Sequence, residues 1–135
     1  MVLIYVPIKA DAFDRRDLLR RTVLSDSFYT DLVVKHVFVV GFTSTESVQQ
    51  RIEMENATHS DILQSTISDA YQFLVVKNLL FWNWFAENCY HAEFVLKMDS
   101  DVFINPFRLT DLVLEMDEKQ RDWSITGFVY PQGAL

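Results

Sequence analysis

The sequence predicts an α/β fold with a mostly parallel sheet, and two observations support this. Short apolar runs typical of buried strands alternate along the chain with longer segments of helical periodicity. Hydrophobic residues make up 50% of the 135 positions, with only three glycines and three prolines, so we expect a packed core rather than a disordered chain. Strands separated by helices pair in parallel, because each helix carries the chain back across the sheet.

The first strand and helix lie at the N-terminus. Residues 2–8 form an apolar, β-branched run that ends at a charged segment, which predicts a buried strand. Residues 14–23 carry alternating charges with leucines at helical spacing. They predict a helix whose start Asp11 or Asp14 can cap.

A second strand and two more helices are expected next. Residues 33–42 predict a strand, and residues 43–52 begin with Thr-Ser-Thr-Glu, which is typical of a capped helix start. Residues 68–88 predict a long helix with apolar side chains on nearly every face. Such a helix is either buried between layers or covered by a part of the protein missing from this chain.

The most informative segment is the motif Asp99-Ser100-Asp101, which ends the apolar run at 94–96. Two carboxylates that point into a cleft repel each other and lose hydration, and a hard divalent cation relieves both penalties. The motif therefore predicts that Asp101 ligates a metal that carries a phosphorylated substrate. The alternative is an ordinary turn, because Asp and Ser hydrogen-bond their own backbone. Apolar residues on both sides favour the metal site, since a surface turn needs no such burial.

The C-terminal part of the chain predicts one more helix and one more strand. Pro106 suits the first turn of a helix at residues 106–116, and residues 124–130 predict a last strand. Because the chain stops soon after this strand without a closing helix, we expect a truncated domain.

Charge and composition limit the partners. The chain has 12 basic and 19 acidic residues and a net charge of −7, which argues against nonspecific binding to nucleic acid or anionic membrane. No apolar run approaches the roughly 20 residues that span a bilayer, and Met1 leads into a strand without the features of a signal peptide. Asn56-Ala57-Thr58 is a glycosylation acceptor sequence, should the protein enter the secretory pathway.

Four sequence blocks occur in a characteristic order. They are Arg15-Arg16-Asp17-Leu18-Leu19-Arg20-Arg21-Thr22, then Val37-Phe38-Val39-Val40-Gly41, then residues 55–77 with Asp61-Ile62-Leu63-Gln64, Asp69, Tyr71, Leu74 and Lys77, and finally residues 89–105 with the Asp-Ser-Asp motif. Together they resemble the β-1,3-galactosyltransferase and β-1,3-N-acetylglucosaminyltransferase family of Golgi hexosyltransferases, glycosyltransferase family 31. The likeness covers almost the whole chain and only the N-terminal, nucleotide-sugar-binding half of the family's catalytic domain.

The resemblance implies a truncated GT-A-like, Rossmann-type nucleotide-diphospho-sugar transferase fold with helices on both faces of the sheet. Residues 1–135 would form a single partial domain, the half that binds the UDP-sugar donor. The implied reaction is metal-dependent and inverting: galactose or N-acetylglucosamine passes in β-1,3 linkage to a glycan acceptor on protein or lipid. The implied location is the lumenal side of the Golgi membrane, through a signal-anchor that this chain lacks.

The resemblance also assigns the motif carboxylates. Asp101, with Asp99 beside it, would bind Mn²⁺, which bridges the donor diphosphate and stabilises the departing UDP. Asp99 would also orient the ribose or the sugar. The general base is expected beyond Leu135, so no catalytic residue is expected in this chain.

Four further residues are candidates for donor binding: Arg16, Arg20, Asp69 and Lys77. Arg16 and Arg20 follow the first strand, where the nucleotide docks in the family, and they offer donors suited to phosphate and to the uracil edge. Asp69 and Lys77 either contact the donor or form a structural pair two turns apart on the long helix.

Two other interpretations stay open. A non-catalytic truncated paralogue or fragment would bind nucleotide-sugar without turnover, or be inactive. A phosphatase of the haloacid dehalogenase type also places Asp-x-Asp after a strand, but on its first strand and with Thr soon after, whereas Val102 and Phe103 follow the motif here. Val23, Phe73 and Val75 replace the family's Trp, Asn and Thr, so packing near the donor is expected to differ.

Overall fold

The computed structural model describes residues 1–70, 73–116 and 125–127. Within these residues, four parallel strands form one sheet in the order β3-β2-β1-β4. The strands are β1 (Val2–Pro7), β2 (Val34–Phe42), β3 (Ile62–Ser68) and β4 (Phe94–Lys97), and the helices are α1 (Phe13–Arg21), α2 (Glu46–His59), α3 (Leu74–Asn88) and α4 (Pro106–Glu115), with a 3₁₀ turn, η1 (Asp26–Phe28). The predicted α/β fold with a parallel sheet is confirmed.

β1 lies inside the sheet because its whole sequence is apolar. All six of its residues are buried, as expected for a parallel strand that is covered on both faces. Its side chains alternate between two cores. Ile4 packs with Leu19 of α1 on one face, and Tyr5 packs with Phe81 of α3 on the other.

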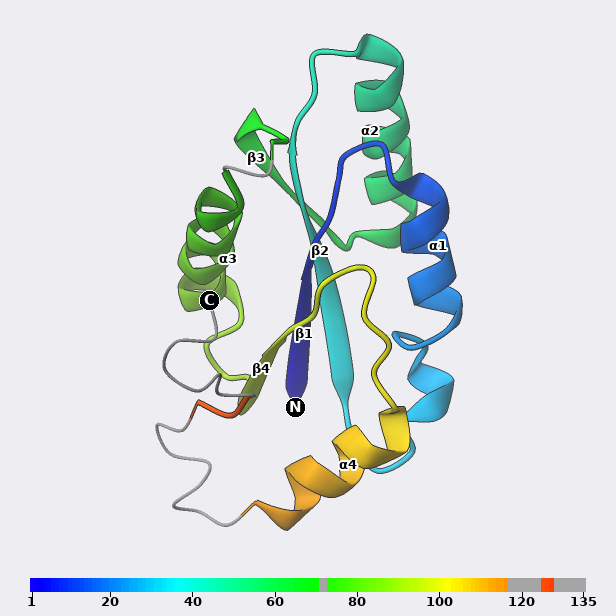
Figure 1. The fold of residues 1–135 in the computed structure, drawn as a ribbon, viewed down its shortest axis with the longest axis vertical. Helices are drawn as coiled ribbons and strands as arrows, with labels where there is room; N and C mark the ends of the chain where they lie inside the picture. The colour runs from blue at the N-terminus through cyan, green and yellow to red at the C-terminus, as the bar shows by residue number, and fades with distance from the viewer. Residues whose placement is uncertain (71–72, 117–124, 128–135) are drawn as a thin grey trace, which may run out of the picture.

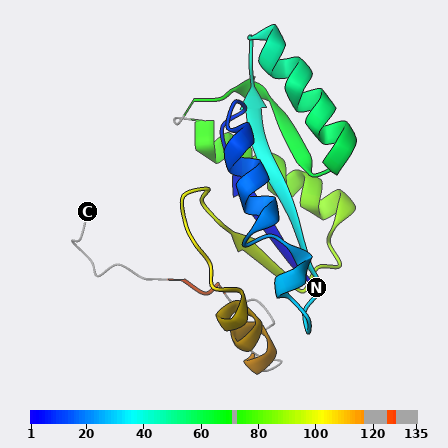
Figure 2. The same ribbon diagram turned by 90° about the vertical axis from the view of Figure 1, so that its right-hand side faces the viewer.

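Helices cover both faces of the sheet. α1 and α2 lie on one side and α3 on the other (Figure 1), and the view from the side of α1 shows that helix in front of the strands (Figure 2). Right-handed crossovers explain this arrangement. The chain moves from β1 to β2 to β3 in one direction across the sheet. It then returns past β2 and β1 to β4, so its third helix, α3, lies on the opposite face. The strand order therefore reverses between β1 and β4.

The sequence prediction omitted β3 and started the long helix too early. Residues 62–68 form an edge strand, and α3 begins at Leu74 rather than at Ser68. Polar residues such as Gln64 and Ser65 concealed the strand, because an edge strand does not need the continuous apolar sequence of a central one. Pairing with β2 determines its conformation.

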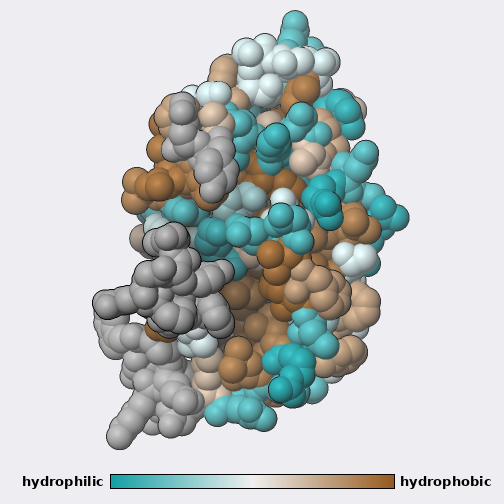
Figure 3. Space-filling view, viewed as in Figure 1, coloured by the Kyte–Doolittle hydropathy of each residue, from teal (hydrophilic) through white to brown (hydrophobic). Residues whose placement is uncertain are grey.

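α3 is less buried than a helix between two layers. Phe81 is fully buried, and its ring stacks on that of Tyr5 with centroids 3.8 Å apart, while Trp84 and Phe85 pack at the edge of the same core. The opposite side of the helix exposes the large apolar residues Val75, Leu79 and Trp82. A second apolar surface lies over α4 and the loop before it (Figure 3), where the exposed residues include Val102, Phe103 and Phe107.

Local sequence signals predicted the start of one helix, α4, correctly and the cap of another, α1, wrongly. α4 begins at Pro106 as predicted, and the Asn105 side chain accepts hydrogen bonds from two backbone N–H groups at 3.0 and 3.2 Å. α1 instead starts after Ala12, so the predicted capping by Asp11 or Asp14 is wrong. The backbone of the preceding loop, which is held by tertiary hydrogen bonds, determines where α1 begins.

Two further predictions concern the C-terminal strand and the membrane. The predicted strand at residues 124–130 lies outside the described residues, apart from 125–127. In the described parts of the chain, no helix is long and apolar enough to cross a bilayer; α3 has 15 residues, whereas about 20 are needed.

Candidate functional site

A pocket of about 450 Å³ lies over the carboxyl ends of β1 and β4, where the strand order reverses. Loops leave these two strands in opposite directions, and the crevice between them is where open α/β sheets bind ligands. We call it the switch-point pocket; it is lined by Pro7, Ile8, Lys9, Asp69, Ala70, Leu74, Lys77, Asp99, Ser100 and Asp101. The structure therefore brings the Asp-Ser-Asp motif together with two of the other four predicted binding residues.

Asp99 and Asp101 lie in the loop after β4, and both are exposed. Asp99 Oδ1 accepts a hydrogen bond from Lys97 Nζ at 2.6 Å. Burial and then the charge of Asp99 raise the pKa of the Tyr5 phenol. Among the described residues, no side chain forms an ion pair or hydrogen bond with the Asp101 carboxylate. Asp101 is therefore the carboxylate that is more available to a ligand.

These carboxylates suit a hard cation that is shared with a substrate. Over the described residues, no group of three or more His, Cys, Asp or Glu side chains is arranged to hold a metal ion. Ions such as Mg²⁺ are often bound by only one or two carboxylates, together with substrate phosphates and water. Two exposed carboxylates that line a pocket fit that pattern, and Mn²⁺ accepts the same oxygen ligands.

Asp69 and Lys77 form an ion pair in the wall of the pocket. Lys77 Nζ also donates to the Ile8 carbonyl at 3.0 Å, and the Asp69 carboxylate accepts from the Ala10 N–H. Because Lys77 is only 7% exposed, its ammonium group is directed at protein acceptors. The predicted structural pair exists, but Asp69 follows β3 instead of lying two turns away on one helix, since α3 begins at Leu74.

Arg16 holds the same loop from the side of α1. Its fully buried guanidinium donates to the carbonyls of Lys9 and Ala10 at 2.9 and 3.2 Å. Charged side chains from α1, α3 and the end of β3 therefore fix the backbone of residues 8–10. The Lys9 side chain is left exposed, and it forms no ion pair with a described residue.

Gly41 allows the end of β3 to approach β2. A Cβ atom at this position would lie 2.5 Å from the Asp69 Cα and 2.8 Å from its backbone nitrogen, far inside normal contact. Any side chain here would displace Asp69, and with it the hydrogen bond to the Ala10 N–H. A glycine within a strand often marks such a close approach of another backbone segment.

A second pocket of about 300 Å³ adjoins the switch-point pocket and shares Lys9 and Asp69 with it. It lies over the carboxyl ends of β2 and β3, and we call it the β2-side pocket. Its remaining lining residues, several of which carry hydroxyl groups, are Ala10, Asp11, Phe42, Thr43, Ser44, Thr45, Val48 and Ser68.

Arg16 and Arg20 do not line the switch-point pocket. Both pair with Glu55, at 2.6 and 2.7 Å, and Arg20 also pairs with Asp61 at 2.7 Å. His36 Nε2 lies 3.0 Å from the same Asp61 carboxylate. We call these five residues the α1–α2 ion cluster. Donor binding by the two arginines stays a prediction, although their guanidinium groups already have protein partners.

The carboxylates of this cluster are strongly stabilised in their charged form. Burial on its own raises the pKa of Asp61, but hydrogen bonds and charges from Arg20 and His36 outweigh it and hold the pKa well below its usual range. Burial likewise opposes ionisation of Glu55, and Arg16 and Arg20 together lower its pKa. The cluster therefore depends on both carboxylates being ionised.

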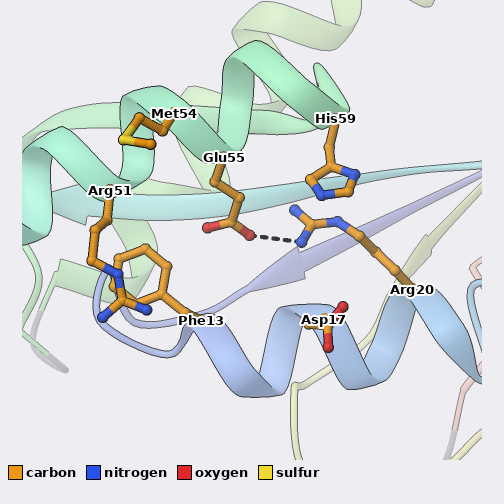
Figure 4. A pocket seen from close by; sticks show the side chains of 7 residues that line it. All are labelled: Phe13, Asp17, Arg20, Arg51, Met54, Glu55 and His59. Atoms are coloured by element: carbon orange, nitrogen blue, oxygen red, sulfur yellow. Dashed lines mark hydrogen bonds and ion pairs between the residues drawn. The ribbon is translucent and has the colours of Figure 1, made fainter.

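A pocket of about 270 Å³ beside the cluster shows how α1 and α2 meet (Figure 4). Arg20 reaches across it to Glu55, and the Arg51 guanidinium lies 3.8 Å from the centroid of the Phe13 ring. Charge and cation–π contacts therefore join the two helices here.

The predicted glycosylation acceptor, Asn56, lies within α2 rather than in a loop. It is half-buried, and its Oδ1 accepts a hydrogen bond from the Ile62 N–H at 3.0 Å. The side chain thus links α2 to β3, and its modification stays a prediction.

The sequence prediction assigned no role at the site to Lys9 or Gly41. A usable signal exists for both. Lys9 is the first charged residue after the first strand, and residues at that position of a parallel strand line the ligand-binding edge. Gly41 interrupts a strand otherwise rich in valine and phenylalanine.

Comparison with known proteins gives a consistent result. The family model described as Galactosyltransferase matches residues 14–135. Lactosylceramide 1,3-N-acetyl-beta-D-glucosaminyltransferase A of Danio rerio is 32% identical over 123 residues, covering 86% of this chain and 32% of the relative. Beta-1,3-galactosyltransferase 1 of Mus musculus is 29% identical over 123 residues, covering 91% of this chain and 38% of the relative. Beta-1,3-galactosyltransferase 5 of Homo sapiens is 32% identical over 114 residues, covering 84% of this chain and 36% of the relative.

The chain thus spans about a third of the length of these relatives. The match begins at the start of α1 and includes the switch-point pocket's Asp-Ser-Asp motif. The resemblance found in the four sequence blocks is confirmed, and the chain belongs to the galactosyltransferase family of glycosyltransferases.

Proposed function

We propose that this chain binds a UDP-sugar in the switch-point pocket and takes part in the transfer of galactose or N-acetylglucosamine to a glycan acceptor. Membership of the galactosyltransferase family supports the reaction class, and the relatives are named for transfer of these two sugars. The observation that carries the proposal is the position of Asp99 and Asp101. Both line a pocket at the reversal of strand order, where α/β sheets bind nucleotides.

Asp101 and Asp99 are the residues that would hold a divalent cation, with Mn²⁺ as the proposed ion. When bound, such an ion neutralises charge on the departing diphosphate. The chain contributes the ligands: Asp101 offers a carboxylate without a partner among the described residues, whereas Asp99 shares one oxygen with Lys97. We therefore assign Asp101 as the main ligand, and Asp99 as a second ligand that also orients the ribose or sugar.

We further propose that transfer inverts the configuration of the sugar and forms a β-1,3 linkage. The relatives' names give a 1,3 linkage of β configuration, and the common UDP-hexose donors carry an α-linked sugar, so a β product requires one displacement with inversion. A general base takes the proton of the acceptor hydroxyl as it attacks. We assign no residue of this chain to that role.

The proposed location is the lumenal side of the Golgi membrane, where glycan acceptors on proteins and lipids are extended. The name of the Danio rerio relative includes a glycolipid acceptor, lactosylceramide, which supports a membrane setting for the reaction. Asn56 is the candidate glycosylation site in that compartment.

Calorimetry with UDP tests the proposal directly. The wild-type chain is titrated with UDP in Mn²⁺ and again after removal of the metal by a chelator. We expect binding only with Mn²⁺, because otherwise the carboxylates of the pocket repel the diphosphate. Equal UDP affinity under both conditions would contradict the metal bridge, and no UDP binding under either condition would contradict the donor site.

In the same assay, Asp101→Asn should weaken UDP binding in Mn²⁺ by more than Asp99→Asn, because loss of the main ligand removes more of the metal affinity. Mutation of a residue that only supports a metal ligand typically lowers metal affinity by about 10- to 100-fold, so loss of a ligand itself should cost at least as much. Asp26→Asn, which removes an exposed carboxylate outside this pocket, is the control and should leave affinity unchanged. A larger loss in Asp99→Asn would reverse the assignment of the two roles.

A chain that binds nucleotide-sugar without turnover is the alternative function. It is distinguished by incubating the chain with UDP-galactose or UDP-N-acetylglucosamine and a glycan acceptor, then measuring product and released UDP. The alternative is supported if the chain binds UDP but forms no product with either sugar donor.

A further inference from the structure

We propose that Lys9 binds the diphosphate of the donor, from the wall between the switch-point pocket and the β2-side pocket. The proposal rests on the proposed function, because it takes a nucleoside diphosphate as the ligand. It adds a cationic contact from the loop after β1, beside the loop after β4 that carries the Asp-Ser-Asp motif, so that both loops contact the diphosphate.

The two pockets meet at Lys9 and Asp69, the residues that line both. Asp69 is committed to protein contacts, because its carboxylate pairs with Lys77 and accepts from the Ala10 N–H. Lys77, the other lysine of the switch-point pocket, is buried and donates to the Ile8 carbonyl. Of the cations that line either pocket, Lys9 alone is exposed and without an ion pair to a described residue.

The backbone that carries Lys9 is held in place by charged groups. Arg16 donates to the carbonyls of Lys9 and Ala10, and Lys77 donates to that of Ile8. Fixing the backbone lowers the entropy lost on binding, because only the lysine side chain remains to be ordered. The buried charges around this loop therefore position the exposed ammonium group of Lys9.

The charge of the site also favours this role. Asp99, Asp101 and Asp69 line the switch-point pocket, and Asp11 lines the β2-side pocket. A diphosphate that enters such surroundings is repelled unless cations face it. Lys9 supplies a compact positive charge with three hydrogen-bond donors, which suits phosphate oxygens.

The test compares UDP with uridine, which lacks the diphosphate. Dissociation constants are measured in saturating Mn²⁺ for the wild-type chain, Lys9→Gln, Lys9→Arg and Lys35→Gln, by calorimetry for UDP and by ligand-observed NMR for uridine. Lys35→Gln removes the same charge from a residue outside both pockets. We expect Lys9→Gln to weaken the binding of UDP by about 10-fold or more, as for loss of a charged hydrogen bond. The affinity for uridine should be unchanged.

Lys9→Arg should restore most of the UDP affinity, because it keeps the charge and the donors. Equal weakening of UDP and uridine by Lys9→Gln would overturn the proposal, as would an equal loss in Lys35→Gln or full UDP affinity in Lys9→Gln. In these three cases wild-type UDP binding still supports the proposed function. Absence of UDP binding to the wild-type chain would overturn both.

Discussion

Gly41 shows how much a single residue contributes to the shape of the site. Its missing side chain lets the Asp69 backbone pack directly against β2. Asp69 cannot simply move away, because its carboxylate is tied to the Ala10 N–H and to Lys77. The wall between the two pockets therefore depends on this glycine.

We predict that Gly41→Ala destabilises the fold by about 1–3 kcal/mol, the usual cost of forcing an extra carbon into a packed position. The free energy of unfolding in urea measures this. Gly127→Ala is the control, because no atom of a described residue other than its chain neighbours lies within 4 Å of the Cβ it would add, and its effect should stay within about 0.5 kcal/mol. Equal stability of the two variants would show that β2 and Asp69 separate without cost.

Residue-level prediction worked best where a side chain's position follows from its neighbours in sequence. Asp99 and Asp101 lie in the loop after β4, so their position at the carboxyl edge of the sheet, where α/β folds bind ligands, could be predicted. The carboxylate partners of Arg16 and Arg20 lie on α2 and just before β3, 35 or more positions away, and nothing in the local pattern indicates them.

At the scale of elements, the α1–α2 ion cluster joins α1 to α2, to β2 and to the residue just before β3. Arg16 is fully buried, and the side chains of Glu55 and Asp61 are 11% and 10% exposed. Buried ion pairs contribute little net stability compared with apolar packing, but loss of one partner leaves an uncompensated charge. The cluster therefore affects stability mainly because loss of any one member leaves an unpaired charge in a poorly hydrated place.

We predict that acid destabilises the chain through this cluster. The folded-state pKa values of Asp61 and Glu55 lie below their ordinary values of 3.8 and 4.5, so the unfolded chain binds more protons in acid. Their stabilisation is fully present above those ordinary values and is lost as the pH falls toward the folded-state values. Unfolding in urea between pH 7 and pH 3 measures the slope, and Asp61→Asn should flatten it.

Glu55→Gln should cost about 3–5 kcal/mol at pH 7, because two buried guanidinium groups lose their shared carboxylate. The control is Asp17→Asn, since Asp17 pairs with Arg21 on the exposed side of α1, and its effect should stay within about 1 kcal/mol. A slope in Asp61→Asn as steep as that of the wild type would show that other groups cause the acid sensitivity.

At the scale of the whole molecule, the apolar side of α3 lies open to solvent. Val75, Leu79 and Trp82 are 66%, 58% and 46% exposed, and their spacing of four and three residues places them on one side of the helix. Exposed apolar patches of this kind favour association.

We predict that the 135-residue chain associates with itself in solution, and that Leu79→Glu shifts it toward the monomer. Sedimentation velocity over a range of concentrations measures the change. Val33→Glu is the matched control, because Val33 is 60% exposed but lies before β2, away from α3. A wild-type chain that stays monomeric, or an equal shift in both variants, would contradict a role for this side of α3.

The sequence by itself determined the fold class, the central apolar strands and the place of the Asp-Ser-Asp motif, because apolar periodicity and strand-end chemistry are local properties of the chain. Only the tertiary structure decided that residues 62–68 pair with β2, that Asp69 lies beside Lys77 and Ala10, and that Lys9 is exposed between two pockets. Those outcomes depend on how the crossovers between parallel strands bring together residues that are far apart in sequence, and no local pattern indicates which charged groups will then meet.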